Sequence, residues 1–349
     1  MANTQKTTTQ LKDLGEFGLI DRLTNDIKLQ HSSSIKGVGD DAAVLDYSGK
    51  QLVVTTDLLV EGVHFDLIYT PLKHLGYKAV VVNLSDVYAM NAVPKQITVS
   101  MAISGKFSLE AVELLYQGIK KACDFYNIDL IGGDTTSSVT GLTISITALG
   151  EVEKGKAVYR NTAKSGDLLC VSGDLGAAYA GLLLLKREKE VFLVNPNSQP
   201  DMSPYDYVLE RQLKPEARRD IFEALKNAGV TPTAMIDISD GLSSEILHLC
   251  KQSGCGAKIR EGSLPIDVQT INVAGELNLD PTLLAMNGGE DYELLFTVNP
   301  KDAEKLQGIT GISVIGEILP KKEEVRLFGK GEGSTLIKAQ GWNAYPEKE

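Results

Sequence analysis

The stretch QITVSMAI, residues 96–103, alternates apolar and polar side chains, and the stretch LTISITA, residues 142–148, does the same. A period of two predicts β-strands with one face against an apolar core and the other face polar. Two such strands predict an open sheet whose polar side is covered by something else.

Working outward from these strands, helical periodicity predicts helices at residues 16–29 and 74–90, and a third that Ser108 can cap. A strand at residues 51–56 leads into Asp57. In the second half, expected strands alternate with expected helices, which is an α/β or α+β pattern. The strands are at 167–172, 235–238, 292–298 and 312–317, and the helices at 175–186, 216–227 and 243–251. Residues 188–207 contain Asn195-Pro196-Asn197 and two further prolines, and we interpret them as a surface loop.

The chain has 349 residues, 43% of them hydrophobic, which is enough for two domains with substantial cores. Composition changes at residues 151–166, which are charged and contain glycine. We therefore expect an N-terminal domain over residues 1–155 and a C-terminal domain over residues 156–349.

The formal charge of −11 argues against binding to nucleic acid or to an anionic membrane surface. Residues 1–10 are polar, unlike a signal peptide, and the longest apolar run, near residues 180–185, is too short to cross a bilayer. The four cysteines form no C-x-x-C pair and the four histidines are dispersed, so we expect reduced thiols, no zinc site and a cytoplasmic protein.

Two common nucleotide-binding motifs are excluded. No G-x-x-x-x-G-K-[ST] sequence occurs. Residues 37–42 fit G-x-G-x-x-A, but a short strand is expected to follow them, whereas a dinucleotide fingerprint opens a helix. Asp40 and Asp41 would also repel a pyrophosphate unless a cation lay between.

Acidic motifs recur instead, mostly at the ends of expected apolar strands. They are Gly39-Asp40-Asp41, Thr55-Thr56-Asp57, Asn83 with Asp86, Gly132-Gly133-Asp134-Thr135, Asp237-Ile238-Ser239-Asp240-Gly241 and Gly289-Glu290-Asp291. Each alone also fits ordinary turn or helix-cap chemistry. Asp86 differs, because its helix is otherwise apolar around it and an unpaired buried carboxylate is costly.

If these carboxylates converge, they need cations. Two unit charges ~4 Å apart repel by about 4 kcal/mol at an effective dielectric of ~20. Oxygen ligands without histidine or cysteine favour Mg²⁺ or Mn²⁺, and Mg²⁺ usually shares its shell with substrate phosphates. The residues therefore predict a site for metal ions and phosphates.

Together these segments resemble thiamine-monophosphate kinases, of the aminoimidazole-ribotide-synthetase-like ATP-binding superfamily. The resemblance runs from Gly15 to about Trp342. The acidic motifs are typical of the superfamily, whereas Glu61-Gly62-Val63-His64-Phe65 and Gly288-Gly289-Glu290-Asp291-Tyr292-Glu293-Leu294 are more specific to these kinases. Asn91 stands where the family often has glycine, and asparagine tolerates the left-handed conformation expected there.

The resemblance implies an N-terminal α/β domain with a mixed sheet that dimerises through this sheet, and a C-terminal α/β domain. It implies ATP and several Mg²⁺ ions between the domains, and phosphorylation of thiamine monophosphate to thiamine diphosphate. By position it assigns metal binding to Asp41, Thr55, Thr56, Asp57, Asp86, Asp134, Asp237 and Asp240. It assigns ATP contacts to Tyr116, Gly133, Asp134, Arg160 and Ser239, and substrate contacts to His64, Glu290 and Trp342.

Among these residues, Asp86, Asp134 and Arg160 are expected to be catalytic, and Asp40 is interpreted as a turn residue that supports the site. The attacking group is itself a phosphate with a second pKa near 6, so the expected in-line transfer needs no general base. Two alternatives stay open. One is another ATP-dependent enzyme of the superfamily, such as a selenophosphate or purine-pathway synthetase, although no cysteine precedes Cys123. The other is a non-catalytic protein that binds divalent cations.

Overall fold

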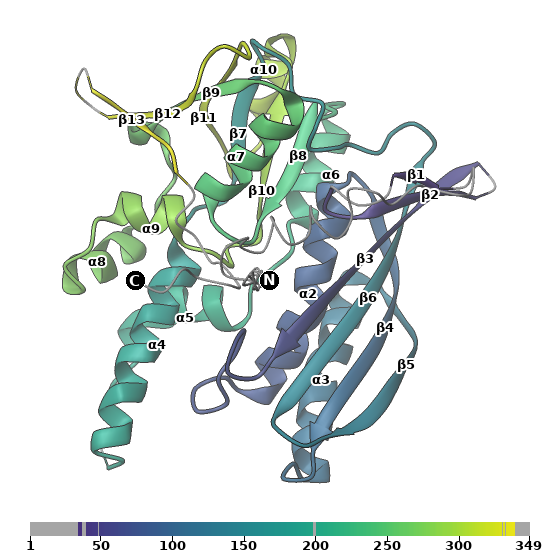
Figure 1. Ribbon diagram of the computed structural model, residues 1–349, viewed down its shortest axis with the longest axis vertical. Coiled ribbons are helices and arrows are strands. Elements are labelled where there is room, and N and C mark those ends of the chain that lie inside the picture. Colours follow the sequence, from purple (N-terminus) through teal and green to yellow (C-terminus); the bar gives the residue numbers. More distant parts are fainter. Residues whose placement is uncertain are drawn as a thin grey trace, which may run out of the picture.

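The computed structural model describes residues 34–36, 40–47, 49–197, 200–329, 331 and 333–338. Within these ranges the chain forms two β-sheets, of order β1-β2-β3-β6-β4-β5 and β13-β12-β9-β11-β7-β10-β8. Each sheet carries its own helices, and the two units lie one above the other in Figure 1. The expected fold, two domains that mix strands and helices, is confirmed.

The N-terminal unit is a mixed sheet with two long helices on one face. Strands β4 and β5 are parallel, and the other neighbouring pairs are antiparallel. Its elements are β1 (Ser34–Lys36), β2 (Ala43–Tyr47), β3 (Lys50–Val60), α2 (Leu72–Ala89), β4 (Val93–Ser104), α3 (Leu109–Tyr126), β5 (Asp129–Ser138) and β6 (Leu142–Glu153).

The alternation of apolar and polar residues at 96–103 and 142–148 is seen in this sheet. Ile97 and Val99 of β4 and Ile146 of β6 are buried against α2 and α3. On the opposite face Thr56 and Ser100 are exposed. The sheet therefore has one apolar, helix-covered face and one polar face, which we call the outer face.

Helices α2 and α3 touch through two glycines. A Cβ atom on Gly76 would lie 2.0 Å from the carbonyl oxygen of Leu115, and one on Gly118 would lie 2.0 Å from that of Lys73. Only glycine allows this separation, so the two helices pack backbone to backbone. The expected cap at Ser108 is also present, because its Oγ accepts a hydrogen bond from the N–H of Ala111 at 3.3 Å.

The C-terminal unit is a sheet with helices around it, and the central strands of this sheet are buried on both faces. Its strands are β7 (Leu168–Ser172), β8 (Ala234–Ile238), β9 (Gly256–Arg260), β10 (Glu293–Val298), β11 (Ile312–Leu319), β12 (Val325–Phe328) and β13 (Ser334–Leu336). Its α-helices are α4 (Ala177–Val194), α5 (Asp206–Leu213), α6 (Arg219–Asn227), α7 (Leu242–Ser253), α8 (Val268–Glu276), α9 (Pro281–Asn287) and α10 (Ala303–Leu306). Short 3₁₀ turns are η2 (Ser203–Tyr205), η3 (Glu261–Ser263) and η4 (Pro300–Asp302).

Alternate residues of β8 explain this double burial. Ile236 packs in the core that includes α7, whereas Met235 packs in a second core that includes α6. That second core also contains Ala89 of α2, so the two units meet along α2. Because α2 is covered on nearly all sides, almost every residue from Leu75 to Ala89 is buried.

Three expectations about elements need correction. Residues 188–207 are not a loop throughout: α4 continues to Val194, where Asn195-Pro196 ends it, and α5 begins at Asp206. The motif Thr55-Thr56-Asp57 does not end a strand, because β3 continues to Val60. The motif at residues 132–135 lies within β5 rather than after it.

The remaining expectations concern Asn91, residues 16–29, the domain boundary and membrane-spanning helices. Asn91 has a φ of 57°, which confirms the left-handed conformation. The helix expected at residues 16–29 lies outside the described residues. The expected domain boundary, between residues 155 and 156, falls in the segment between β6 and β7. None of the helices in the described ranges is both long and apolar enough to cross a bilayer.

Candidate active site

Three carboxylates meet where the two units face each other. Asp41 precedes β2, Asp86 lies near the end of α2, and Asp237 lies in β8 of the other unit. One oxygen from each lies within 4.8 Å of the others. We call these three residues the carboxylate cluster.

Neighbouring hydroxyl and amide groups orient the cluster. Thr55 Oγ1 donates to Asp86 Oδ2 at 2.6 Å and lies 3.3 Å from the backbone oxygen of Asp41. Ser85 Oγ donates to Asp237 Oδ2 at 2.7 Å. The N–H of Asp57 donates to Asn83 Oδ1 at 3.0 Å, which fixes β3 against α2 beside the cluster.

Burial makes this concentration of charge unfavourable. Burial, followed by the charges of the neighbouring aspartates, raises the pKa of Asp86 well above its ordinary value. Burial also raises the pKa of Asp237 to about 6, and burial with the nearby Asp237 raises that of Asp57 to about 6. At neutral pH the cluster is therefore a site that favours bound positive charge.

Arg160 supplies one positive charge from the segment that joins the two units. Its guanidinium contacts Asp41 Oδ1, and its Nε donates to Asp40 Oδ1 at 3.2 Å. The backbone N–H of Arg160 also donates to the Asp40 carboxylate, 3.3 Å from each oxygen. Asp40 is thus more than a turn residue, because it holds both the backbone and the side chain of Arg160.

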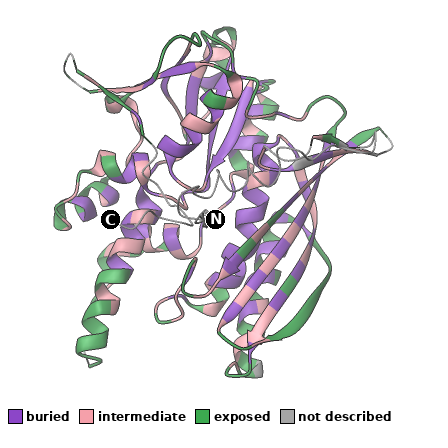
Figure 2. Cartoon of the chain, viewed as in Figure 1, coloured by how far each residue is buried: buried purple, intermediate pink, exposed green. Residues whose placement is uncertain are grey.

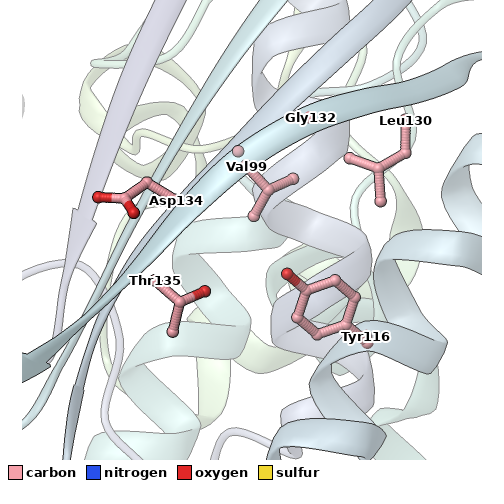
Figure 3. A pocket seen from close by; sticks show the side chains of 7 residues that line it. Val99, Tyr116, Leu130, Gly132, Asp134 and Thr135 are labelled. Carbon is pink, nitrogen blue, oxygen red and sulfur yellow. The ribbon is translucent and has the colours of Figure 1, made fainter.

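Four expected residues lie away from the carboxylate cluster. Thr56 points to the outer face, where its hydroxyl contacts that of Thr147 at 3.1 Å. Gly133 and Tyr116 line a pocket of about 430 Å³ beside β5. Figure 3 shows Asp134 on the opposite side of β5 from Tyr116. Since β6 and β4 separate β5 from β3, Asp134 lies roughly 14 Å from β3, at about 4.8 Å per strand.

Two expected substrate residues meet at a second, smaller pocket between the units. His64 lines this pocket, and its Nδ1 accepts a hydrogen bond from the N–H of Val60 at 3.0 Å. Glu290 lies beside it, bound to the pocket residues Lys78 and Gln212. The N–H of Glu290 donates to the backbone oxygen of Ser239 at 2.7 Å, which connects this pocket to the strand that carries Asp237. Trp342 lies outside the described residues.

The chain matches two family models: AIR synthase related protein, N-terminal domain, over residues 39–152, and AIR synthase related protein, C-terminal domain, over residues 164–328. It is 34% identical over 341 residues to thiamine-monophosphate kinase of Bacillus subtilis, covering 95% of this chain and 100% of the relative. It is 36% identical over 337 residues to that of Aquifex aeolicus, covering 96% of this chain and 100% of the relative. This chain belongs to the thiamine-monophosphate kinase family.

Solved structures of the thiamine-monophosphate kinase family share the whole fold. A structure described as AaThiL complexed with AMPPCP and TMP aligns with a TM-score of 0.83 and 34% identity, over 97% of this chain and all of the other. A thiamine monophosphate kinase structure from Aquifex aeolicus aligns with a TM-score of 0.76 and 32% identity, over 93% of this chain and 99% of the other.

Several contacts in this kinase fold involve residues that the sequence motifs did not single out. Lys78, like Asp86, is a charged residue in an apolar part of α2. The same reasoning that singled out Asp86 could therefore have singled out Lys78 from the sequence. Gln212 on α5 carried no such signal. Glu245, buried in the first turn of α7, accepts the N–H of Asp240 at 3.1 Å and holds the start of that helix.

The carboxylate cluster also has the chemistry to hold a divalent cation. Asp41 Oδ2 is buried and has no hydrogen-bond partner among the described residues. All the charged donor atoms of the cluster are carboxylate oxygens, which Mg²⁺ prefers. These residues therefore fit Mg²⁺, with Asp41, Asp86 and Asp237 as its holders.

Proposed function

We propose that this chain transfers the γ-phosphoryl group of ATP to the phosphate of thiamine monophosphate, forming thiamine diphosphate and ADP. The observation that carries this proposal is the carboxylate cluster between the two units, which shares helix α2 with the pocket that His64 lines and Glu290 flanks. Family membership over almost the whole chain supports the same reaction. So does the similarity to a structure that contains AMPPCP, an ATP analogue, together with TMP.

We also propose that the enzyme uses Mg²⁺, held by Asp41, Asp86 and Asp237, with Asp57 and Asp240 nearby. When bound, Mg²⁺ supplies positive charge that offsets the repulsion between the phosphates. The unpartnered oxygen of Asp41 and the raised pKa values of the carboxylates support this assignment.

The side chains then orient groups and balance charge rather than move protons. The acceptor phosphate is already mostly deprotonated at neutral pH, so no side chain has to act as a base. Arg160 lies beside the cluster, and we assign it to the phosphates of ATP. Asp40 keeps Arg160 aimed at that position. Thr55 and Ser85 hold Asp86 and Asp237 in their orientations.

We further propose that two copies of the chain complete the site. Thr56 and Asp134 both point to the outer face of the sheet, but within one chain three strand spacings separate them. A two-fold dimer through the outer face would bring Asp134 of the partner subunit toward Thr56, whereas Tyr116 lies on the helix-covered side of β5. The exposure of β5 along its length, visible in Figure 2, supports this interface.

Within this dimer we assign residues 1–155 to metal and ATP binding and to dimerisation. Residues 156–349 complete the nucleotide and acceptor sites, with Ser239 at the nucleotide and Trp342 at the acceptor. We place the enzyme in the cytoplasm, where ATP is supplied.

A single assay tests the function. The purified chain is incubated with ATP, Mg²⁺ and thiamine monophosphate, and the products are separated by chromatography. We expect thiamine diphosphate and ADP in equal amounts. ATP consumption only with a different acceptor would indicate another enzyme of the superfamily, and no ATP consumption despite Mg²⁺ binding would indicate a non-catalytic protein; either result overturns the proposal.

A further inference from the structure

The turn that ends helix α7 carries a cysteine at each of its two ends. After Ser253 the chain passes through Gly254, whose φ is 65°, and the N–H of Cys255 donates to the backbone oxygen of Cys250 at 3.0 Å. The N–H of Gly254 donates to the same oxygen. Turns closed in this way bring the side chains of their first and last residues into contact. Here both of these side chains are thiols.

The two thiols contact each other and differ in exposure. Cys250 is 2% exposed and lies in the core between α7 and the sheet, whereas Cys255 is partly exposed and packs at the edge of the same core. Sγ of Cys255 donates to the backbone oxygen of Cys250 at 3.8 Å, and the thiol of Cys250 donates to the sulfur of Cys255. Solvent therefore reaches one thiol of the pair, and the other lies buried beside it.

Cys255 is also the most reactive of the four cysteines. The hydrogen bond from Cys250 lowers the pKa of the Cys255 thiol, although partial burial and the charge of Asp167 act in the opposite direction. Burial raises the pKa of Cys123 to about 11 and that of Cys170 to about 12. Because the thiolate is the form that attacks an oxidant, we expect Cys255 to react first.

The same turn holds the backbone of Arg160. Ser253 lies between the two cysteines, and its Oγ donates to the backbone oxygen of Arg160 at 3.1 Å. The same Oγ accepts the N–H of Ala163 at 3.2 Å. The guanidinium of Arg160 contacts Asp41 of the carboxylate cluster. A displacement of this turn is therefore passed on to an arginine at the candidate active site.

We propose that hydroperoxides oxidise Cys250 and Cys255 to a reversible disulfide, and that this bond weakens the binding of ATP. The effect on ATP rests on the proposed function, which assigns Arg160 to the ATP phosphates, whereas formation of the disulfide does not. Two sulfur atoms in contact must approach to about 2 Å to form the bond, which tightens the turn and moves Ser253. The turn has room for this change, because a Cβ on Gly254 would meet nothing within 4 Å.

The reaction has two steps. The thiolate of Cys255 attacks one oxygen of the hydroperoxide, so that an S–O bond forms, the O–O bond breaks, and the other oxygen leaves and takes up a proton. The sulfur of Cys250 then attacks the resulting sulfenic acid: the S–S bond forms, the S–O bond breaks, and hydroxide leaves with the thiol proton as water. Two thiols thus lose two hydrogens, and the hydroperoxide accepts the two electrons.

The first test detects the disulfide. The reduced full-length chain is treated with equimolar hydrogen peroxide, its remaining thiols are blocked, and it is denatured and digested with trypsin. Trypsin cleaves after Lys251, between the two cysteines, so the disulfide holds together two peptides that otherwise separate. Mass spectrometry should find this linked pair, lighter by two hydrogens than the two free peptides together, and dithiothreitol should separate it.

Two variants assign the reaction to this pair. Cys255→Ser should form no linked peptides, whereas Cys123→Ala, the matched control at an unreactive cysteine of α3, should form them as the wild type does. A wild-type chain that gives only overoxidised Cys255, or a disulfide between two molecules on a non-reducing gel, would overturn the proposal.

The second test measures the effect on the nucleotide. Binding of AMPPCP with Mg²⁺ is measured by calorimetry on the reduced and the oxidised chain. We expect the oxidised chain to bind roughly tenfold more weakly, since a shift of about 1 Å in a positioned group has effects of this order or more. In Ser253→Ala the disulfide should still form, but oxidation should change the affinity by about twofold or less, because the link from the turn to Arg160 is gone.

The outcomes separate this inference from the proposed function. A chain that forms no disulfide, or that binds AMPPCP equally well in both states, would overturn the inference even if the reduced chain makes thiamine diphosphate. A reduced chain that makes no thiamine diphosphate, but whose oxidation and nucleotide binding change as expected, would contradict the proposed function and leave the role of the cysteine pair supported.

Discussion

At the scale of single residues, the carboxylate cluster is a compromise between folding and function. Asp41, Asp86 and Asp237 are concentrated in a buried place where each raises the free energy of ionising another. Such an arrangement destabilises the metal-free chain, and it is useful only if a cation and phosphates occupy the site. We therefore expect changes in the cluster to affect activity and stability in opposite directions.

The first prediction concerns activity. Asp86→Asn keeps the size of the side chain and can still accept from Thr55, but it removes one negative charge from the cluster. We expect turnover to fall by at least a few hundredfold, the order of loss seen when a preorganised electrostatic group is removed. Steady-state formation of thiamine diphosphate measures the effect, and circular dichroism checks the fold.

Asp124→Asn provides the control, since Asp124 is exposed on α3. It should behave like the wild type. Near-normal turnover of Asp86→Asn at ordinary magnesium concentrations would show that Asp86 does not act at the site.

The second prediction concerns stability and pH. In the folded, metal-free chain the pKa values of Asp57 and Asp237 are about 6, above the ordinary value of 3.8. The folded state therefore binds more protons than the unfolded state between these values, so the free energy of unfolding falls as the pH rises from about 4 to about 6.

Asp237→Asn removes part of this penalty. Without divalent cations, we expect the variant to melt several degrees above the wild type at pH 7.5 and close to it at pH 4. Added Mg²⁺ should stabilise the wild type much more than the variant. Thermal melts with and without chelator measure both effects, and a variant that is less stable at pH 7.5 would refute the argument.

At the scale of elements, α2 organises the site. It carries Lys78 at the pocket beside Glu290, and Asn83, Ser85 and Asp86 at the carboxylate cluster. The position of α2 depends on close contact with α3 through Gly76 and Gly118. A change in that contact should therefore displace the site residues that α2 carries.

Gly76→Ala and Gly118→Ala test this dependence. Each added methyl group would lie 2.0 Å from a carbonyl oxygen of the facing helix. We expect each variant to lose on the order of 1–3 kcal/mol of unfolding free energy, as for other overpacked sites, and to lose activity as α2 moves.

The matched control is Gly275→Ala in α8, where a Cβ meets nothing within 4 Å. Because alanine is the better helix former, this change should be neutral or slightly stabilising. Equal melting temperatures for all three variants would show that the close packing of α2 and α3 is not essential.

The elements also show what the sequence could predict. Alternation predicted β4 and β6 because each strand has one buried face, and the apolar setting of Asp86 singled out a carboxylate that the structure places beside Asp41 and Asp237. The extent of α4 was missed because prolines were taken to govern all of residues 188–207, although the residues before Asn195 favour a helix.

The positions of Thr56 and Asp134 could not be predicted from the sequence. The face to which a strand residue points depends on the register of pairing, and pairing joins segments far apart in the chain. The partners of Gln212 were hidden for a similar reason, because Lys78 and Glu290 reach it from 134 residues before and 78 residues after it.

At the scale of the whole molecule, the proposed dimer makes each site depend on two chains. This can be tested by mixing two inactive variants, Asp86→Asn and Asp134→Asn, under conditions that exchange subunits. In a hybrid dimer with sites across the interface, one site receives both defects and the other receives none. A random mixture should recover about a quarter of wild-type activity, because half the dimers are hybrids with one intact site each.

Each variant taken through the same exchange alone is the control and should stay inactive. If Asp134 acts within its own chain, mixing restores nothing. Sedimentation measurements on both variants show whether dimers are present, so a failure to dimerise is told apart from a site within one chain.

Helix α2 also sets how long the acceptor must be. Asp86 is the eighth residue after Lys78, so about 12 Å of helix separates the pocket beside Glu290 from the carboxylate cluster. Because α2 is packed on nearly all sides, the distance between these two places is fixed. An acceptor anchored by its ring reaches the metal end only if its other end is long enough, so free thiamine, one phosphate shorter, would stop before the point of transfer. The enzyme would thus discriminate against free thiamine through this fixed distance, and no side chain would have to clash with free thiamine.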